Sequence, residues 1–407
     1  MDVVLLGGDL SAYSVAVSFH SEFGIKSTAF CRYRCGITGY SSLIDIRVEP
    51  DILDDAIGTS ILLRHANERK SRPYLIPCGD WYVAFLSRNR EALKNAYRFL
   101  IPSEETFEKA SDKAEFYKML EKEGLSYPKT RVLSFGYLSL SKFLTDWKYP
   151  AVLKPSRSVS YYAHSFADMA KVYFPQNPKE ALDTAEKIFA SGYRDTLVLQ
   201  EYIGSENKKP IAKTLTLLSD HNGIVRRGVL GEVLIEEQAK GARGNYAAIL
   251  TRPPDALTCR LISFVEKIGY VGASNFDILS YEGKEYILEL NPRHGRSCDY
   301  LRSAGVNLAR FFVDAIDENP MQTDLSSRVG LWHAVPLFAV RGMISKNEKA
   351  TLSSLKRDGR TTSVFQYEGE RKTLRRRAYL QIHAIRRTLA LKNRKVKQNG
   401  KAFRKEN

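Results

Sequence analysis

Residues 273–291 are the segment that most limits how this chain can fold. Two strand-like runs of apolar residues are separated there by a Glu-Gly pair, a pattern that predicts a β-hairpin. Asp277 lies in the first run, and Glu289 lies in the second. Alternate residues of a strand share one face, so Glu289, Asn291 and the following Arg293 are expected on the same side. The segment therefore predicts either a strand that runs out into a polar loop or a site for a metal and phosphate.

Two carboxylates and an amide brought together across a hairpin form an oxygen-rich site for a hard cation. Mg²⁺ takes one or two such carboxylates together with nucleotide phosphates. Upstream, Lys113 lies in a helix-like segment and Lys154 ends an apolar strand-like run, so both are candidates for phosphate contacts. Taken singly, each of these residues also fits an exposed, solvated position. Their order and spacing together carry the prediction.

The length and composition indicate a globular protein of two or three domains. The chain has 407 residues, of which 43% are hydrophobic. It has no run of about 18 uncharged apolar residues, the length that spans a membrane. Its first residues lack the basic segment of a secretory signal, so we expect a cytoplasmic protein. Five cysteines, an odd number, favour reduced thiols over a disulfide framework.

The basic character is concentrated near the C-terminal end. Residues 371–407 carry 14 Lys and Arg and one Glu, which is +13 of the formal charge of +16, so the preceding body is nearly neutral. Five apolar residues of this segment fall on one helical face with arginines around it: Leu374, Ala378, Ile382, Ile385 and Leu389. Such a helix predicts docking to the inner face of a membrane, binding to nucleic acid, or a solvated tail that caps the body. The nearly neutral body argues against nucleic acid as a partner.

Five segments can be distinguished along the chain. Residues 1–100 show the pattern strand, Gly-Gly turn, helix, strand, which predicts a parallel α/β domain whose turn is weaker than a full dinucleotide-binding fingerprint. Residues 101–205 predict a small α+β unit. Residues 206–330 predict antiparallel strands, a helix and the hairpin. An extension at 331–370 and a basic helical tail at 371–407 follow.

Five motifs occur in the order SDK, VLKP, LVLQEYI, FD and ELNPR, and with them the chain resembles the ATP-grasp superfamily from residue 100 to about residue 320. The resemblance implies an α/β fold with an N-terminal parallel pre-ATP-grasp domain, a small α+β lid domain and a larger antiparallel-sheet C-terminal domain. The chain further resembles the carboxylate–amine ligase branch, which includes D-aspartate ligases of peptidoglycan cross-bridge synthesis. That similarity rests on LLGGDLSAYSVAVSFHSEFGIKS, VLKPSRSVSYY, GEVLIEEQAKGARGNYAAILTRP and YEGERKTLRRRAYL.

The resemblance implies a role in binding ATP, magnesium and substrate for residues of these motifs. Phosphate contacts would come from Lys113, Lys154, Ser156 and Ser158. The hinge that reads adenine would be Gln200, Glu201 and Ile203, and the ribose would be reached by Glu206 or Asn207. Magnesium would be held by Asp277, Glu289 and Asn291. Catalytic contacts would come from Arg293 and Lys213, and the carboxylate substrate would be held by Lys240, Arg243, Asn245, His294 and Arg296. For Lys213 and for the loop residues at 240–245, a solvated position is the alternative.

Two features depart from the family pattern. The loop after Lys154 is usually glycine-rich so that its backbone can close over phosphates, whereas here it reads PSRSVSYYAHS. Hydroxyl groups, with Arg157, would then replace backbone donors in a stiffer lid. The first metal ligand is Asp277 where many relatives have Glu, so its carboxylate reaches less far. Neither departure removes the predicted site.

The implied chemistry is ATP-dependent ligation of a carboxylate to an amine. ATP phosphorylates the carboxylate to an acyl phosphate, and attack by an amine then forms an amide and releases phosphate. The substrates would be an amino acid, such as D-aspartate, or another small carboxylate, and an amine on an anionic cell-wall precursor. One alternative is a ligase that makes a dipeptide or another small amide. Another is a nucleic-acid-binding protein with a structural ATP site, and the intact acid, amide and arginine set at 277–293 favours the enzyme.

Overall fold

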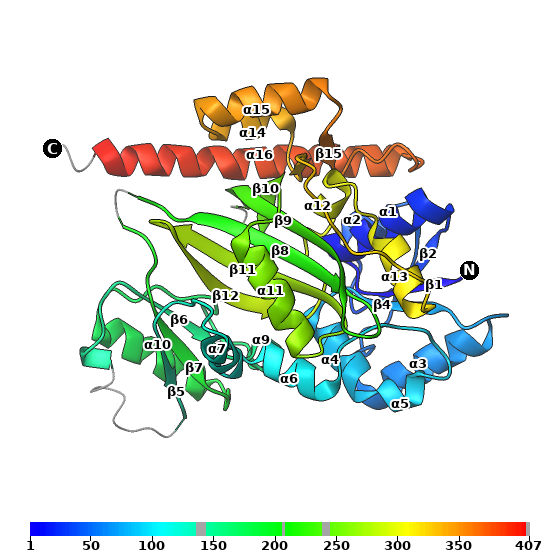
Figure 1. Ribbon diagram of the computed structural model, residues 1–407, viewed down its shortest axis with the longest axis horizontal. Helices are drawn as coiled ribbons and strands as arrows, with labels where there is room; N and C mark the ends of the chain where they lie inside the picture. The colour runs from blue at the N-terminus through cyan, green and yellow to red at the C-terminus, as the bar shows by residue number, and fades with distance from the viewer. Residues whose placement is uncertain (136–143, 206–207, 238–244, 404–407) are drawn as a thin grey trace. The chain divides into compact units, whose positions relative to one another are not determined.

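The computed structural model describes residues 1–135, 144–205, 208–237 and 245–403, with side chains described up to residue 391 (Figure 1). The chain divides into two compact units, which are described separately. Unit 1 comprises Met1–Ile101, Thr214–Ser274 and Arg293–Asn407. Unit 2 comprises Pro102–Lys213 and Asn275–Pro292. The five segments expected from the sequence remain a prediction.

Unit 1 begins with the expected parallel α/β fold. A four-stranded parallel sheet has the order β3-β2-β1-β4, from β1 (Val3–Leu6), β2 (Ser27–Cys31), β3 (Ile44–Val48) and β4 (Tyr74–Pro77). Gly7 follows β1 at φ +139°, and a Cβ there would lie 3.0 Å from the Cβ of Cys78, so both conformation and space call for glycine. The helices are α1 (Leu10–Phe23), α2 (Gly36–Gly39), α3 (Asp55–Asn67), α4 (Asp80–Arg88) and α5 (Arg90–Leu93).

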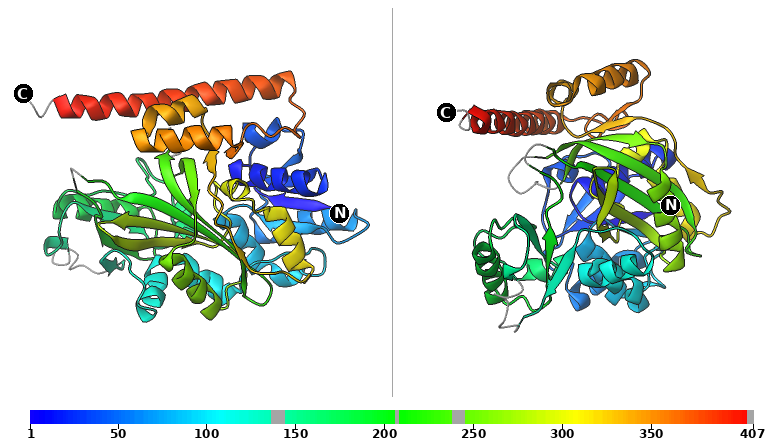
Figure 2. Two further views of the ribbon diagram at one scale, coloured as in Figure 1. Left: turned by 45° about the horizontal axis from the view of Figure 1, so that its top comes forward. Right: turned by 60° about the vertical axis from the view of Figure 1, so that its left-hand side comes forward.

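An antiparallel-rich sheet forms the second part of unit 1. Strands pair there in the order β8 (Ile211–Ser219), β9 (Val225–Glu236), β10 (Tyr246–Arg252), β14 (Leu331–His333) and β15 (Thr361–Ser363), and β13 (Asp324–Leu325) pairs with β9. The accompanying helices are α11 (Ala256–Lys267), α12 (Tyr300–Ser303) and α13 (Leu308–Ile316). Helix α13 packs beside α1, as Figure 2 shows, and the two helices share one apolar core with the sheet. Trp332, fully buried, donates its indole N–H to Asp299 in that core.

The C-terminal part of unit 1 consists of α14 (Leu337–Met343), α15 (Lys346–Arg357) and the long helix α16 (Leu374–Phe403). The tail is therefore helical, as predicted, and it packs on unit 1. Arg376 is fully buried, donates to Glu370 at 3.0 Å and lies over the ring of Tyr13. A Cβ on Gly36 would lie 2.3 Å from the ring of Tyr379, so α16 needs a glycine in α2 to approach this closely. The predicted apolar stripe faces away from these anchors.

Unit 2 holds a three-stranded antiparallel sheet and a hairpin. The sheet has the order β5-β7-β6, from β5 (Thr130–Leu133), β6 (Ala151–Pro155) and β7 (Leu197–Glu201). The hairpin is β11 (Gly272–Tyr281) with β12 (Lys284–Asn291); β8 and β11 each have residues in both units. The helices are α6 (Glu104–Ser111), α7 (Lys113–Lys122), α9 (Ser158–Ala163) and α10 (Pro178–Ala190). Helix α10 buries its apolar face in the core of the small sheet.

Candidate nucleotide and metal site

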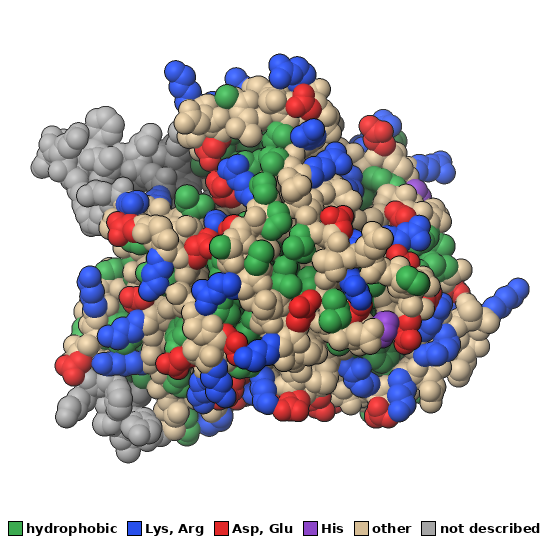
Figure 3. All heavy atoms as spheres, in the orientation of Figure 1, with side chains coloured by type: hydrophobic (Ala, Val, Ile, Leu, Met, Phe, Trp, Pro, Cys, Tyr) green, Lys and Arg blue, Asp and Glu red, His purple; other side chains and the backbone are tan. Residues whose placement is uncertain are grey.

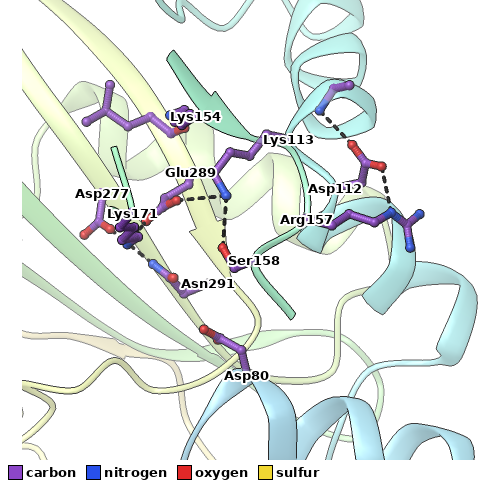
Figure 4. A network of polar contacts seen from close by, with 12 residues as sticks. Asp80, Asp112, Lys113, Lys154, Arg157, Ser158, Lys171, Asp277, Glu289 and Asn291 are labelled. Atoms are coloured by element: carbon purple, nitrogen blue, oxygen red, sulfur yellow. Dashed lines mark hydrogen bonds and ion pairs between the residues drawn. The ribbon is translucent and has the colours of Figure 1, made fainter. Parts of the chain in front are cut away.

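The hairpin of unit 2 brings the two predicted acids and the amide together. Asp277 of β11 is the register partner of Glu289 of β12, and Asn275 is the partner of Asn291. The side-chain amide of Asn291 donates to Asp277 Oδ2 at 3.2 Å and to the backbone carbonyl of Asn275 at 3.3 Å. Glu289 and Asn291 are both less than one-tenth exposed. The three side chains expected to hold magnesium therefore lie next to one another on paired strands (Figure 4).

Glu289 is surrounded by lysines from three segments of unit 2. Nζ of Lys113, the first residue of α7, lies 3.2 Å from Oε2, and Nζ of Lys171 lies 2.9 Å from Oε1 (Figure 4). Burial alone would raise the pKa of Glu289, but the ammonium groups of Lys171, Lys113 and Lys154 outweigh it and hold this pKa well below the usual range. The carboxylate is therefore ionised at neutral pH, as a metal ligand must be.

Lys154 is a buried cation with little compensation. It is the penultimate residue of β6, is 7% exposed, and donates to the backbone carbonyl of Leu288 at a long 3.4 Å. Its Nζ also lies 5.8 Å from the ring centroid of Tyr117, a weak cation–π distance. Burial lowers the pKa of Lys154 to about 8, although Glu289 raises it. An anionic ligand would supply the missing counter-charge.

The donor atoms of this site fit Mg²⁺, which also takes phosphate and water ligands, better than a metal whose ligands all come from protein side chains. Within the described residues, no group of three or more His, Cys, Asp or Glu side chains gathers at one point. Two carboxylates and one amide leave coordination positions for phosphate oxygens and water, which is how Mg²⁺ is bound in nucleotide enzymes. The nearby lysines can bind the same phosphates.

The predicted adenine hinge lies at the end of β7. Gln200 is 2% exposed, and its amide donates to Thr130 Oγ1 at 2.7 Å. Glu201 Oε1 accepts from the backbone N–H of Lys129 at 2.8 Å, and Ile203 is buried. These side chains are tied into unit 2, which leaves backbone groups as the means of reading a base. Glu206 and Asn207, the predicted ribose contacts, lie outside the described residues.

The serine-rich segment is partly helical and not a loop throughout. Ser158 begins α9, and its hydroxyl lies 3.5 Å from Nζ of Lys113. Ser156 is fully buried, and its backbone carbonyl accepts from the N–H of Lys113 at 3.2 Å. Arg157 Nε donates to Asp112 at 2.9 Å and its Nη1 to Glu108, so this guanidinium is bound to α6 and to the cap of α7. Ser158 is thus better placed than Ser156 to reach a ligand beside Lys113.

The other predicted residues fall in several places. Lys213, in β8, forms an ion pair with Glu285 of β12. Arg293 Nε lies 2.9 Å from Oδ1 of Asp80, the first residue of α4, in unit 1. The backbone carbonyl of Asn245 accepts from Glu237 at 2.8 Å. Lys240 and Arg243 lie outside the described residues.

His294 is buried in unit 1 instead of lining a surface. It is 1% exposed, its Nε2 lies 2.9 Å from the hydroxyl of Ser11, and its ring meets Phe312 edge-on. Burial, with the charge of Arg293, lowers its pKa to about 3, so the imidazole is neutral at physiological pH. This placement favours a structural role for His294 over the predicted contact with substrate.

Sequence reasoning missed Lys171 and Asp80. Lys171 lies in an irregular segment after α9 and meets a glutamate 118 residues away, so no local pattern indicates the contact. Asp80 follows Gly79 at the end of β4, where a strand–Gly–acid pattern similar to that of Asp9 could have suggested it. Both contacts depend on the tertiary fold.

Comparison with known proteins identifies a matching domain and related sequences. Residues 110–297 match the family model described as ATP-grasp domain, and this range includes the hairpin and all three lysines. The chain carries an ATP-grasp domain. It is 29% identical over 385 residues to the D-aspartate ligase of Enterococcus faecium, which covers 90% of each chain. It is also 28% identical over 218 residues to the carbamoyl phosphate synthase large chain of Myxococcus xanthus, which covers 51% of this chain and 18% of that one.

Solved structures agree on the ATP-grasp fold. The biotin carboxylase domain of Hydrogenobacter thermophilus 2-oxoglutarate carboxylase, solved with MgADP, has a TM-score of 0.57 at 18% identity, covering 81% of this chain and 73% of that one. The L-amino acid ligase from Bacillus licheniformis has a TM-score of 0.56 at 16% identity, covering 79% and 75%. The expected α/β fold with parallel and antiparallel-rich sheets is confirmed. Together the comparisons support ATP- and magnesium-dependent ligation of a carboxylate to an amine, with release of ADP.

Proposed function

We propose that this chain activates the carboxylate of an amino acid, D-aspartate or a close analogue, and joins it to an amine of an anionic cell-wall precursor. A carboxylate oxygen attacks the γ-phosphorus of ATP, and the bond to ADP breaks. The amine nitrogen then attacks the acyl carbon, phosphate leaves with the bonding pair, and the nitrogen loses a proton. The similarity to D-aspartate ligase along nearly the whole chain supports this choice of substrates.

The residues of unit 2 have complementary roles in this proposal. Asp277, Glu289 and Asn291 would hold magnesium, which neutralises charge on the phosphates when bound. Lys113 and Lys154 bind and orient the triphosphate. Positioning and fixed positive charge make up most of the catalytic contribution that a protein gives to phosphoryl transfer.

One observation carries the proposal, namely three ammonium groups gathered around a single buried carboxylate. Lys113 and Lys171 contact Glu289, while Lys154 is buried beside them with one long hydrogen bond. Lys113 and Lys154 are both buried while Lys171 is partly exposed, and buried positive charge is costly unless an anion completes it. A nucleotide triphosphate with magnesium supplies that anion.

The first test is product analysis with purified protein, ATP, magnesium, D- and L-amino acids and amine acceptors. We expect ADP and phosphate, and a hydroxamate when hydroxylamine replaces the amine. AMP and pyrophosphate would indicate adenylation and would overturn the acyl-phosphate route. Glu289→Gln should lower ADP release by about two orders of magnitude or more, the scale of losing one preorganised charged group. Glu282→Gln, in the exposed turn of the same hairpin, is the matched control.

We also propose that α16 holds the enzyme against an anionic membrane surface. Leu374, Ile382, Ile385 and Leu389 are each at least half exposed, while Arg376 on the opposite face of the helix is buried. The stripe is flanked by Arg375 and Arg386, which are exposed. Apolar side chains bordered by cations match the interface of an anionic bilayer. No helix in the described part of the chain could itself cross a membrane.

Vesicle sedimentation tests this contact. Wild-type protein should bind phosphatidylglycerol vesicles at low salt and bind phosphatidylcholine vesicles weakly, because cations contribute to the attraction. The double variant Ile382→Asp/Ile385→Asp should lose binding, whereas Ile57→Asp, a change at a 48% exposed position of α3, should not. Equal binding by all three proteins, or dimerisation through the stripe in place of vesicle binding, would overturn the proposal.

The face drawn in Figure 3 has Lys and Arg interspersed with Asp and Glu, without a continuous basic strip for nucleic acid.

A further inference from the structure

Helix α16 also contributes to a buried charged cluster in unit 1. Glu237 follows β9 and is 3% exposed. Its Oε1 lies 2.6 Å from Nη1 of Arg387 of α16 and 3.3 Å from Nη1 of Arg296. Two guanidinium groups therefore share one carboxylate oxygen. Oε2 of Glu237 is buried without a hydrogen-bond partner among the described residues.

The two arginines of this cluster differ in how firmly they are held. The side chain of Arg387 is 9% exposed, also donates to the backbone carbonyl of Ala334, and lies over the ring of Phe365. The side chain of Arg296 is 29% exposed and has looser contacts, including Nε at 3.6 Å from Asp9 Oδ2. Arg296 thus presents a partly open fork of N–H donors, the geometry that matches a carboxylate.

We infer that Arg387 is a positioning residue for substrate binding: by holding Glu237, it leaves Arg296 available for the carboxylate of the amino-acid substrate. This inference rests on the proposed function for the identity of the ligand. A buried carboxylate that loses one cation draws strongly on the next, because an unpaired buried charge is costly. Without Arg387, Arg296 is the cation that remains paired with Glu237 among the described residues, and its guanidinium closes onto that carboxylate. Its donors are then less available to a ligand.

The other buried arginine of α16 shows what a purely structural anchor looks like. Arg376 pairs with Glu370, whose two oxygens also accept from Tyr13 at 2.8 Å and Ser41 at 2.5 Å. Both side chains of this pair are completely buried, and every carboxylate oxygen has a partner. Among the described residues, no partly exposed arginine pairs with Glu370. The cluster at Glu237 therefore combines anchoring of the helix with a donor that faces solvent.

The first test measures the availability of Arg296 without relying on enzyme activity. Phenylglyoxal modifies accessible arginines, and the adduct on Arg296 can be followed by mass spectrometry. We expect Arg387→Met to slow modification of Arg296 several-fold, because that guanidinium closes onto Glu237. Arg386→Met, a change at the neighbouring exposed position, should leave the rate unchanged. An unchanged rate in folded Arg387→Met protein would overturn the inference, whatever reaction the enzyme catalyses.

The second test separates substrate binding from ATP binding. In Arg387→Met the KM for D-aspartate should rise about tenfold, while the KM for ATP changes less than about twofold, because the loss is confined to one substrate. Arg387→Lys keeps the positive charge, so its KM for D-aspartate should stay closer to the wild-type value. Adding Glu237→Gln to Arg387→Met should restore affinity in part, because the attraction on Arg296 is removed. If the effects of the two changes on the KM for D-aspartate simply add, Arg387 has a merely structural role. If the wild-type protein shows no activity, that result counts against the proposed function alone.

Discussion

At the scale of single residues, the ionisation of Lys154 makes ATP binding dependent on pH. Burial lowers the pKa of Lys154 to about 8, so the free enzyme loses this ammonium group as pH rises through that value. We expect kcat/KM for ATP to be flat below about pH 8 and to fall by up to tenfold per pH unit above it, because that parameter reports groups of the free enzyme. Initial rates between pH 6.5 and 9.5, about 1.5 units on each side of that pKa, measure the falling limb of this pH profile.

Two variants locate the cause of this pH dependence. Lys154→Arg should remove the limb, because a guanidinium stays charged across the range. Lys118→Arg, on the exposed side of α7, should leave the profile as it is. If the fall near pH 8 persists in Lys154→Arg, the pH dependence comes from another group.

The candidate site could be predicted from the sequence where local pattern fixes it, and not where distant segments meet. The Glu-Gly turn and the apolar runs predict one hairpin that carries Asp277 and Glu289 on its two strands. Their direct pairing depends in addition on a register shift between Asp277 and Ile278, because the register set by the turn alone would place Asp277 opposite Leu288. Lys171 and Arg387 could not be predicted, since each reaches its carboxylate only after the tertiary fold has formed. The burial of His294 was missed for the same reason, because a polar residue after a motif looks exposed in sequence.

At the scale of elements, the start of α7 connects helix stability to the nucleotide site. The Asp112 side chain accepts from the N–H of Ala114 at 2.9 Å and also holds Arg157, while the next residue is Lys113. Asp112→Ala should lower the free energy of unfolding by about 1–2 kcal/mol, the usual loss for an N-cap. It should also raise the KM for ATP several-fold, because the first turn that carries Lys113 loosens.

A second helix of unit 2 supplies the control for this prediction. Ser103 caps α6 by accepting from the N–H of Thr106 at 3.1 Å, and α6 carries no predicted phosphate contact. Ser103→Ala should therefore cost a similar free energy of unfolding but leave the KM for ATP unchanged. Denaturant unfolding and initial-rate kinetics on both variants check the comparison. Equal KM values for the two variants would mean that the cap does not position Lys113.

At the scale of the whole molecule, the basic tail is not a detachable segment. The sequence showed where the charge lies, at +13 of +16 in residues 371–407, but could not show that some of those cations are interior. Arg376 is fully buried and Arg387 is 8% exposed, each against a carboxylate of unit 1. Their pairing depends on contacts between residues far apart in the chain, which composition and periodicity do not contain. The exposed cations and apolar stripe of α16 remain for binding a surface.

The last prediction follows from these two buried pairs. A chain that ends at residue 373 leaves the carboxylates of Glu370 and Glu237 without Arg376 and Arg387, and breaking a buried pair costs about 3–5 kcal/mol. Two such losses are comparable to the stability of a typical domain, about 5–15 kcal/mol, so this chain should unfold or aggregate. A chain that ends at residue 391 keeps both pairs and should have a melting temperature close to that of the full chain. Circular dichroism and gel filtration of the two chains decide the matter: similar melting by the shorter one would mean that α16 is only appended to unit 1.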